Sequence, residues 1–574
     1  MTNHLRIALA QLNPTLGDIA GNLAKARTAR AEAAAAGADL IVFSELFICG
    51  YPPEDLVLKP AFQLASMRAV EDFAADTADG GPAVIVGAPW REGDLIMNTA
   101  AYLAGGRIEA IRAKVDLPNY GPFDEKRVFD SGPLPGPITL KGVRIGVPIC
   151  EDIWTDEVTE CLAETGAEIL IVPNGSPYWR DKSDERLQIV VNRVVETRLP
   201  ILYLNQVGGQ DELIFDGASF GVESDSSLAF QLPAFKEAVA ILDYVRERGR
   251  WTCRHGSVVA VPEGIGSDWE ACVLGLKDYV EKNRFPGVVL GLSGGIDSAV
   301  VAAMAVDALG PDRVHCVMMP YHYTAGESLA DAAELATALG VRYDIVPIAP
   351  AIEGFEALLS PLFAGRNADI TEENLQSRAR GSILMAISNK FGSMVLTTGN
   401  KSEMSVGYAT LYGDMNGGFN PIKDLYKTQV FAAAKWRNEN MPAGGLGPSG
   451  KVIPDNIITR PPSAELRPDQ KDEDSLPPYP VLDAVLECLV EQEMPISDII
   501  DKGYPAETVK RVEWLLRVAE YKRRQAAPGV KITRKNFGRD RRYPITNGFR
   551  DPGVKVVFDD QTRVKKPQED TIDY

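Results

Sequence analysis

Three side chains of different chemistry follow apolar runs in the first half of the chain. Glu45 comes just after 40–43, Cys150 ends the run 143–149, and Lys114 lies between them. Attack of sulfur on an amide needs a thiolate, so a base must take the thiol proton. A carboxylate can be that base, and an ammonium can stabilise the oxyanion of the tetrahedral intermediate. The set predicts an amidase with Cys150 as nucleophile, Glu45 as base and Lys114 as stabilising cation.

A glycine-rich segment in the second half predicts a phosphate site. The apolar run 288–292 is followed by Ser293-Gly-Gly-Ile-Asp-Ser298 and then by a helical pattern. Glycines let backbone N–H groups close around phosphate oxygens, and a helix N-terminus adds partial positive charge. Asp297 would repel phosphate unless a divalent cation lay between them, which indicates a Mg²⁺ ligand. The lysine and spacing of a Walker loop are missing.

The first half resembles the nitrilase superfamily of amidases. The matching segments begin at Ser44-Glu45-Leu-Phe, at Lys114-Val-Asp-Leu-Pro and at Cys150-Glu-Asp-Ile-Trp. In that family Glu is the general base, Lys stabilises the oxyanion and Cys is the nucleophile.

The same resemblance implies a glutamine pocket. Its expected residues lie in 119–127 and 174–182: Tyr120 and Phe123 line the pocket, and Ser176 and Lys182 anchor the substrate. At position 182 many relatives have arginine, and this chain keeps a cation there.

The glycine-rich segment resembles the PP-loop of ATP pyrophosphatases, which release pyrophosphate and adenylylate their substrate. Further matching segments start at Thr371, Leu396 and Leu411. With the amidase half in front, residues 4–548 resemble the family of glutamine-dependent NAD⁺ synthetases.

This second resemblance implies roles for particular residues. Asn374, Glu403 and Lys522 would contact deamido-NAD⁺, and Asp297 and Glu403 would hold Mg²⁺. The residues expected on ATP are Gly291, Leu292, Ser293, Gly294, Gly295, Ile296, Asp297, Ser298, Thr398, Lys427 and Ser463.

The resemblance also implies the reaction, that of a carbon–nitrogen ligase with glutamine as nitrogen donor. ATP would convert the carboxylate of deamido-NAD⁺ into an acyl-adenylate, and ammonia from glutamine would displace AMP to give NAD⁺. Glutamate, AMP and pyrophosphate would be the other products. Because free ammonia becomes ammonium in water, an internal passage between the two sites is expected.

Alternating strand and helix patterns predict an α/β protein of two domains. We expect a nitrilase-like α-β-β-α sandwich over residues 1–262. Residues 263–574 should form a doubly wound parallel sheet with the PP-loop, similar to the adenine nucleotide alpha hydrolases. The break in rhythm at 246–267 indicates the domain connection. A long loop is expected over 443–479 and a poorly ordered tail over 550–574.

Composition limits the partners and the compartment. The formal net charge of −19 disfavours nucleic acid, whose binders need a surplus of cations. Seven scattered cysteines without a C-x-x-C pair argue against a disulfide framework and favour the cytoplasm. There is no signal pattern and no apolar run long enough to span a membrane. The family resemblance implies a homo-oligomer, a dimer or larger.

Two classes of alternative stay open. One is a different PP-loop enzyme, either another amidotransferase or a tRNA-thiolating enzyme, against which the negative charge and the missing C-x-x-C pairs speak. The other is a catalytically inactive nucleotide sensor, which would bind deamido-NAD⁺ without releasing AMP.

Overall fold

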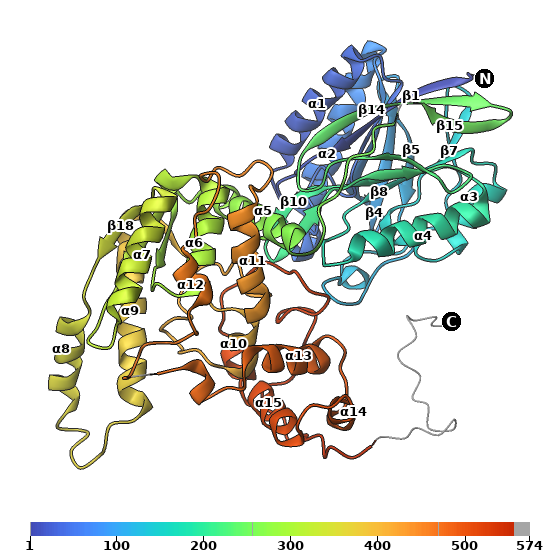
Figure 1. Cartoon of the computed structure of the whole chain (residues 1–574). Coiled ribbons are helices and arrows are strands. Elements are labelled where there is room, and N and C mark those ends of the chain that lie inside the picture. The colour runs from blue at the N-terminus through green and yellow to red at the C-terminus, as the bar shows by residue number, and fades with distance from the viewer. Residues whose placement is uncertain (1, 255, 469, 556–574) are drawn as a thin grey trace.

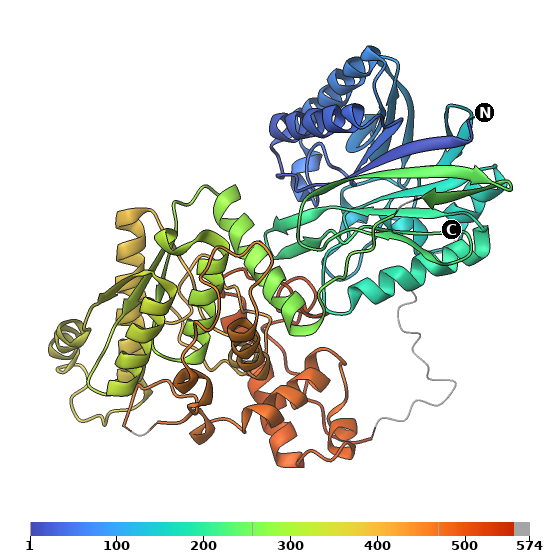
Figure 2. The ribbon, with the colours of Figure 1, turned by 45° about the horizontal axis from the view of Figure 1, so that its top comes forward.

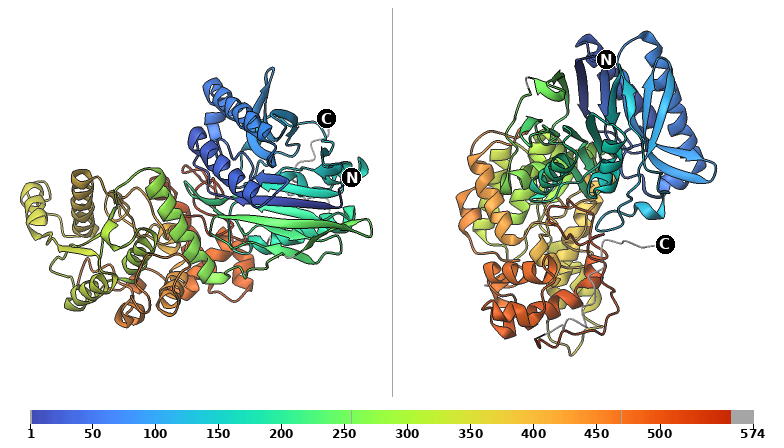
Figure 3. Two further views of the ribbon diagram at one scale, coloured as in Figure 1. Left: turned by 90° about the horizontal axis from the view of Figure 1, so that it is seen from above. Right: turned by 90° about the vertical axis from the view of Figure 1, so that its right-hand side faces the viewer.

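The computed structural model describes residues 2–254, 256–468 and 470–555. Figure 1 shows the N-terminal half, blue to green, beside the C-terminal half, green to red. The two halves meet at helix α5 (Gly264–Lys282), which Figure 3 shows along their junction. Of the predicted tail, 550–555 form no helix or strand, and 556–574 lie outside the described residues.

Two sheets stacked face to face form the centre of the N-terminal half. The first has the order β15 (Arg250–Arg254), β14 (Ala238–Glu247), β1 (His4–Gln11), β2 (Leu40–Phe43), β3 (Ala83–Glu92), β4 (Leu95–Ala104) and β5 (Arg107–Ala113). The second has the order β13 (Leu228–Gln231), β12 (Phe220–Val222), β9 (Ile201–Asn205), β8 (Ile169–Asn174), β7 (Val143–Gly146) and β6 (Ile138–Leu140). A separate hairpin joins β10 (Val207–Gln210) and β11 (Leu213–Asp216).

Helices cover the outer face of each sheet. Side chains of α1 (Ile19–Ala35) and α2 (Pro60–Asp76) pack on the first sheet. Those of α3 (Glu157–Glu164) and α4 (Lys182–Thr197) pack on the second. Apolar residues of both sheets meet between them, so that the strands are buried on two faces, as their continuous apolar runs predicted. Figure 2 shows the layers, and the predicted α-β-β-α sandwich is confirmed.

The expected domain connection is shorter than the sequence indicated. Residues 246–254 of the predicted connection belong to the antiparallel pair β14–β15, whose turn is at Arg248–Gly249. Gly264 and Gly266, also within the predicted connection, lie in the first turn of α5. The prediction failed here because a hairpin with charged outer side chains has the composition of a linker.

A parallel sheet forms the centre of the C-terminal half. Its order is β18 (Arg342–Ile345), β17 (Val314–Met318), β16 (Val288–Gly291) and β19 (Met394–Val395). The strand order reverses direction between β16 and β19, and this is the switch point at which open α/β sheets bind ligands. The predicted doubly wound parallel sheet is confirmed.

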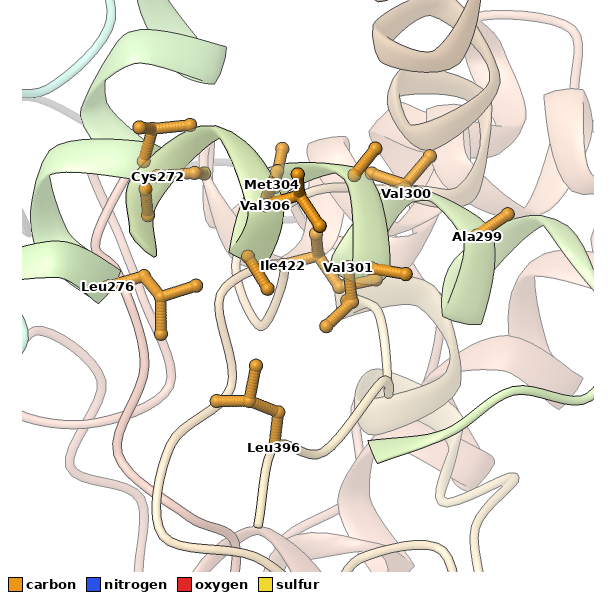
Figure 4. Packing of buried hydrophobic residues seen from close by; sticks show 14 of the residues in the cluster. Cys272, Leu276, Ala299, Val300, Val301, Met304, Val306, Leu396 and Ile422 are labelled. Atoms are coloured by element: carbon orange, nitrogen blue, oxygen red, sulfur yellow. The ribbon is translucent and has the colours of Figure 1, made fainter. Parts of the chain in front are cut away.

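Helices cover both faces of this sheet. The more apolar face packs on α5 and α6 (Ile296–Leu309), whose buried side chains Figure 4 shows beside Leu396 and Ile422. The other face packs on α8 (Ala349–Leu359) and α9 (Ile370–Phe391). The remaining helices of the described residues are α7 (Gly326–Leu339), α10 (Lys401–Val406), α11 (Lys427–Glu439), α12 (Asp455–Thr459), α13 (Tyr479–Val490), α14 (Ile496–Asp501), α15 (Ala506–Val518) and α16 (Glu520–Arg523).

The predicted long loop over 443–479 is only partly a loop. It contains α12 and a short 3-10 turn at Asp472–Asp474, and its last residue begins α13. Pro462 to Leu466 line the cavity described below, so that this segment covers a site.

Polar contacts join the two halves. Lys282 at the end of α5 donates from Nζ to Asn13 Oδ1 and to the Gly209 carbonyl, both at 2.8 Å. On the other side, Lys423 Nζ lies 2.7 Å from Glu212 Oε1. No helix in the described residues is long and apolar enough to cross a bilayer.

Candidate active sites

The structure brings Glu45 and Lys114 together at the centre of the sandwich. Lys114 Nζ lies 2.8 Å from Glu45 Oε1, and both side chains are wholly buried. The other Glu45 oxygen accepts a hydrogen bond from the Gly175 amide at 2.8 Å. At Gly87 a Cβ would lie 2.2 Å from the Leu46 nitrogen, so only glycine lets β3 pass this close to the turn that carries Glu45.

Sequence reasoning missed a second carboxylate at this centre. Glu125 contacts Lys114 Nζ through both oxygens, at 2.9 and 3.0 Å, and Tyr51 donates its hydroxyl to Glu125 at 2.7 Å. Glu125 lies in the segment read only for Tyr120 and Phe123, and a loop carboxylate has no periodicity that marks it. Asn98, also missed, donates to Glu45 Oε1 at 2.7 Å.

Cys150 lies in a 3-10 turn that follows β7 rather than in the strand itself. Its φ of 48° is in the left-handed region, which is costly for a residue with a Cβ. Asp152 holds the turn in place, because its carboxylate accepts from the amides of Ile149 at 2.8 Å and Val115 at 2.9 Å. The strained turn is thus tied to the segment that carries Lys114.

Burial controls the ionisation of these groups. Burial and the Glu45 carboxylate raise the pKa of the Cys150 thiol well above its usual value, with Lys114 opposing them. Burial would lower the pKa of Lys114, but Glu125 and Glu45 together raise it well above the usual range. The resting centre therefore holds a protonated thiol beside an ammonium, and a base is needed to form the thiolate.

Of the residues predicted for glutamine, Tyr120 contacts the turn that carries Cys150. Tyr120 donates its hydroxyl to Glu151 at 2.9 Å, and its ring packs edge-on against Phe123 with centroids 5.5 Å apart. Ser176 and Lys182 are both buried, one after β8 and one at the start of α4.

A buried arginine holds Ser176 in place. Arg186 donates from Nε to Ser176 Oγ at 3.0 Å and pairs with Asp216 at 2.8 Å. Sequence reasoning missed Arg186, although it lies four residues after Lys182 and therefore on the same face of α4.

A cavity of about 280 Å³ opens at the switch point of the C-terminal sheet. Residues from the glycine-rich segment, from the end of β19 and from the covering loop meet in it. The predicted residues that line it are Gly291, Leu292, Ser293, Gly295, Ile296, Asp297, Ser298, Thr398, Glu403, Lys427 and Ser463.

The glycine-rich segment has the backbone of a phosphate loop. Gly294 has φ of 82°, and a Cβ there would lie 2.4 Å from the Ser328 carbonyl oxygen, so its backbone packs against α7. Gly294 itself does not line the cavity. The hydroxyls of Ser293 and Ser298 lie 3.1 Å apart, and α6 begins at Ile296.

Two carboxylates converge on one cation at the cavity wall. Lys427 Nζ lies 2.5 Å from Asp297 Oδ2 and 3.1 Å from Glu403 Oε1. Asn400 donates to the other Asp297 oxygen at 2.9 Å. Burial raises the pKa of Glu403 to about 8, with Lys427 opposing the shift.

The two carboxylates have the chemistry of a Mg²⁺ site, because Asp297 and Glu403 offer the hard oxygen atoms that Mg²⁺ prefers. Lys427 Nζ takes the point that they share, so a Mg²⁺ ion would bind there only if this ammonium moved. In the described residues no group of three or more His, Cys, Asp and Glu side chains could hold a metal. Phosphate and water would therefore supply the remaining ligands.

Two of the residues predicted for deamido-NAD⁺ do not line the cavity. Asn374 accepts a hydrogen bond from the Thr410 hydroxyl at 2.9 Å. Lys522 donates from Nζ to the carbonyls of Gly407 and Ala409, both at 2.7 Å. The structure brings Glu403 to the cavity and ties the other two to neighbouring loops.

Comparison with known proteins matches both halves. The carbon-nitrogen hydrolase family model matches residues 6–252, and the NAD synthase model matches residues 268–526. A glutamine-dependent NAD⁺ synthetase of Rhodobacter capsulatus is 53% identical over 96% of this chain and 100% of its own length. One of Thermotoga maritima is 42% identical over 96% of this chain and 99% of its own length.

Solved structures give the same match. The glutamine-dependent NAD⁺ synthetase of Acinetobacter baumannii, in complex with ADP, is 42% identical with a TM-score of 0.76, covering 96% of this chain and 99% of that one. The enzyme of Cytophaga hutchinsonii, at 23% identity, shares the fold with a TM-score of 0.80, covering 95% of this chain and 98% of that one.

Proposed function

Because the chain belongs to the family of glutamine-dependent NAD⁺ synthetases, we propose that it makes NAD⁺ from deamido-NAD⁺, ATP and glutamine. Glutamate, AMP and pyrophosphate are the other products. One observation carries the proposal: a buried Glu45–Lys114 pair beside Cys150 and a glycine-rich phosphate loop occur in one chain. In this proposal, residues 1–262 act as the glutaminase and residues 263–574 act as the synthetase.

In the glutaminase, Glu45 takes the proton of the Cys150 thiol as sulfur attacks the glutamine amide. Lys114 stabilises the oxyanion, and the ammonia leaves with a proton returned by Glu45. A water molecule activated by Glu45 then hydrolyses the thioester. Tyr120 and Phe123 wall the pocket, and Ser176 and Lys182 anchor the amino-acid end of glutamine.

In the synthetase, the backbone from 291 to 298 holds the ATP phosphates, with Thr398, Lys427 and Ser463 around the nucleotide. A relative of known structure holds ADP, which supports a nucleotide here. Asp297 and Glu403 would hold Mg²⁺, which offsets phosphate charge when bound.

The dinucleotide and the ammonia need further groups. Asn374, Glu403 and Lys522 remain the proposed contacts of deamido-NAD⁺. To bind it, Asn374 and Lys522 would have to give up their present hydrogen bonds to neighbouring loops. We propose that ammonia passes internally between the sites. Family resemblance supports a homo-oligomer, and the seven free thiols support a cytoplasmic setting.

A product assay tests the function. The protein is given deamido-NAD⁺ and ATP with glutamine, then with ammonium chloride, and NAD⁺, glutamate, AMP and pyrophosphate are measured. Equal amounts of NAD⁺ and AMP from both nitrogen sources are expected. Release of ADP in place of AMP would refute the acyl-adenylate intermediate. Binding of deamido-NAD⁺ without AMP release would favour the inactive sensor.

A further inference from the structure

The Lys182 ammonium lies between two indole rings. Its Nζ is 3.9 Å from the ring centroid of Trp154 and 3.6 Å from that of Trp179. Trp154 directly follows the 3-10 turn Cys150–Ile153, and Trp179 lies in the segment between β8 and α4. The two rings therefore fix a cation at the edge of the glutaminase centre.

The cage leaves hydrogen-bonding capacity on the ammonium. A lysine ammonium has three N–H donors, and one is directed to Glu185 Oε2 at 3.1 Å. In the described part of the chain Nζ has no second hydrogen-bond acceptor, although the side chain is only 3% exposed. A buried cation with donors to spare suits an anionic ligand.

We propose that Trp154 and Trp179 are positioning residues that hold the Lys182 ammonium to receive the α-carboxylate of glutamine. The cage thus selects for the amino-acid end of the donor rather than for its amide. The inference rests on the proposed function, because it takes glutamine as the nitrogen donor. Arginine would bring its own planar fork, whereas lysine is a point charge that needs the rings to direct it.

Several charged groups face this ammonium. Glu185 and Arg186 lie on α4, and Glu151 directly follows Cys150 in the turn. Lys531 of the other half places its Nζ 5.7 Å from the ring centroid of Trp179. Burial lowers the pKa of Lys182 to about 7, and Glu185 partly offsets this. The charged form, which binds a carboxylate, therefore predominates below pH 7 and is lost as pH rises through that value.

The pH dependence of the KM for glutamine tests the role of the cation. In the wild type the KM is expected to rise above pH 7, approaching about tenfold per pH unit. In Lys182→Arg the KM should stay flat, because the guanidinium remains charged. Ammonium-driven synthesis, which bypasses the pocket, should have the same pH profile in both. Parallel KM profiles for the two proteins would overturn the proposal.

Variants of the cage test the rings themselves. Trp154→Leu and Trp179→Leu should each raise the KM for glutamine about two- to thirtyfold, with kcat changed less. Trp154→Phe and Trp179→Phe should restore part of the loss. Trp514→Leu, on an indole 51% exposed on α15, is the matched control and should change nothing.

A truncated donor separates recognition from folding. Butyramide carries a primary amide without the amino-acid end, so its kcat/KM should not change in the leucine variants while that for glutamine falls. An equal fall for both amides would overturn the proposal and reduce the rings to structural support. Wild-type protein that makes NAD⁺ from ammonium but releases no glutamate from glutamine would instead refute the proposed function.

Discussion

Replacing Glu125 by glutamine removes one of the two negative charges that hold Lys114. The amide keeps the shape, but the two contacts at 2.9 and 3.0 Å lose their charge. A hydrogen bond to a charged group contributes about 1.5–3 kcal/mol, which is about 10- to 150-fold in rate. Lys114 would then depend on Glu45 alone, and Glu45 would be less able to accept the thiol proton.

The rate of glutamate release from glutamine, with ATP and deamido-NAD⁺ present, measures this effect. We expect Glu125→Gln to lower kcat within that range and to leave ammonium-driven NAD⁺ synthesis unchanged, which also reports correct folding. Glu237→Gln is the matched control, because Glu237 pairs with Lys25 at the surface. A glutaminase rate within twofold of wild type would refute the need for a second carboxylate.

Three further predictions concern the synthetase and the domain contacts. Asp297→Asn should abolish NAD⁺ synthesis with glutamine and with ammonium, because it weakens the Mg²⁺ site; normal synthesis would exclude that role. Asp307→Ala leaves Arg437 buried without its partner at 2.7 Å, and should lower the free energy of unfolding by about 3–5 kcal/mol in urea titrations. An unchanged titration midpoint would contradict this. Lys282→Met removes the hydrogen bond from Lys282 to Asn13, so the urea midpoint of unfolding should be lower in the variant than in the wild type; equal midpoints would show that the contact adds no stability.

Patterns of apolar residues predicted most of the fold. The apolar run 40–43 is a strand with those bounds, and the run 288–292 contains β16, because a strand buried on both faces is apolar throughout. The hairpin β14–β15 was missed because its outer side chains face water and carry charge. Local composition does not distinguish such a hairpin from a linker.

The candidate sites were predicted as far as single segments allow. Cys150 was expected at a strand end, and it lies four residues after the last residue of β7, in a turn where its own backbone is left-handed. Glu125 is brought to Lys114 only by the path of a loop, which no periodicity encodes. The cage around Lys182 adds Trp154 to Trp179 and Lys182 of the predicted segment 174–182, and only folding brings Trp154 to that segment.

Cys150→Ala tests the division of labour between the two halves most directly. With ATP and deamido-NAD⁺ present, this variant should make no NAD⁺ from glutamine, yet make it at the wild-type rate from ammonium. NAD⁺ synthesis from glutamine by the variant would show that nitrogen is released without this thiol, and would contradict the account.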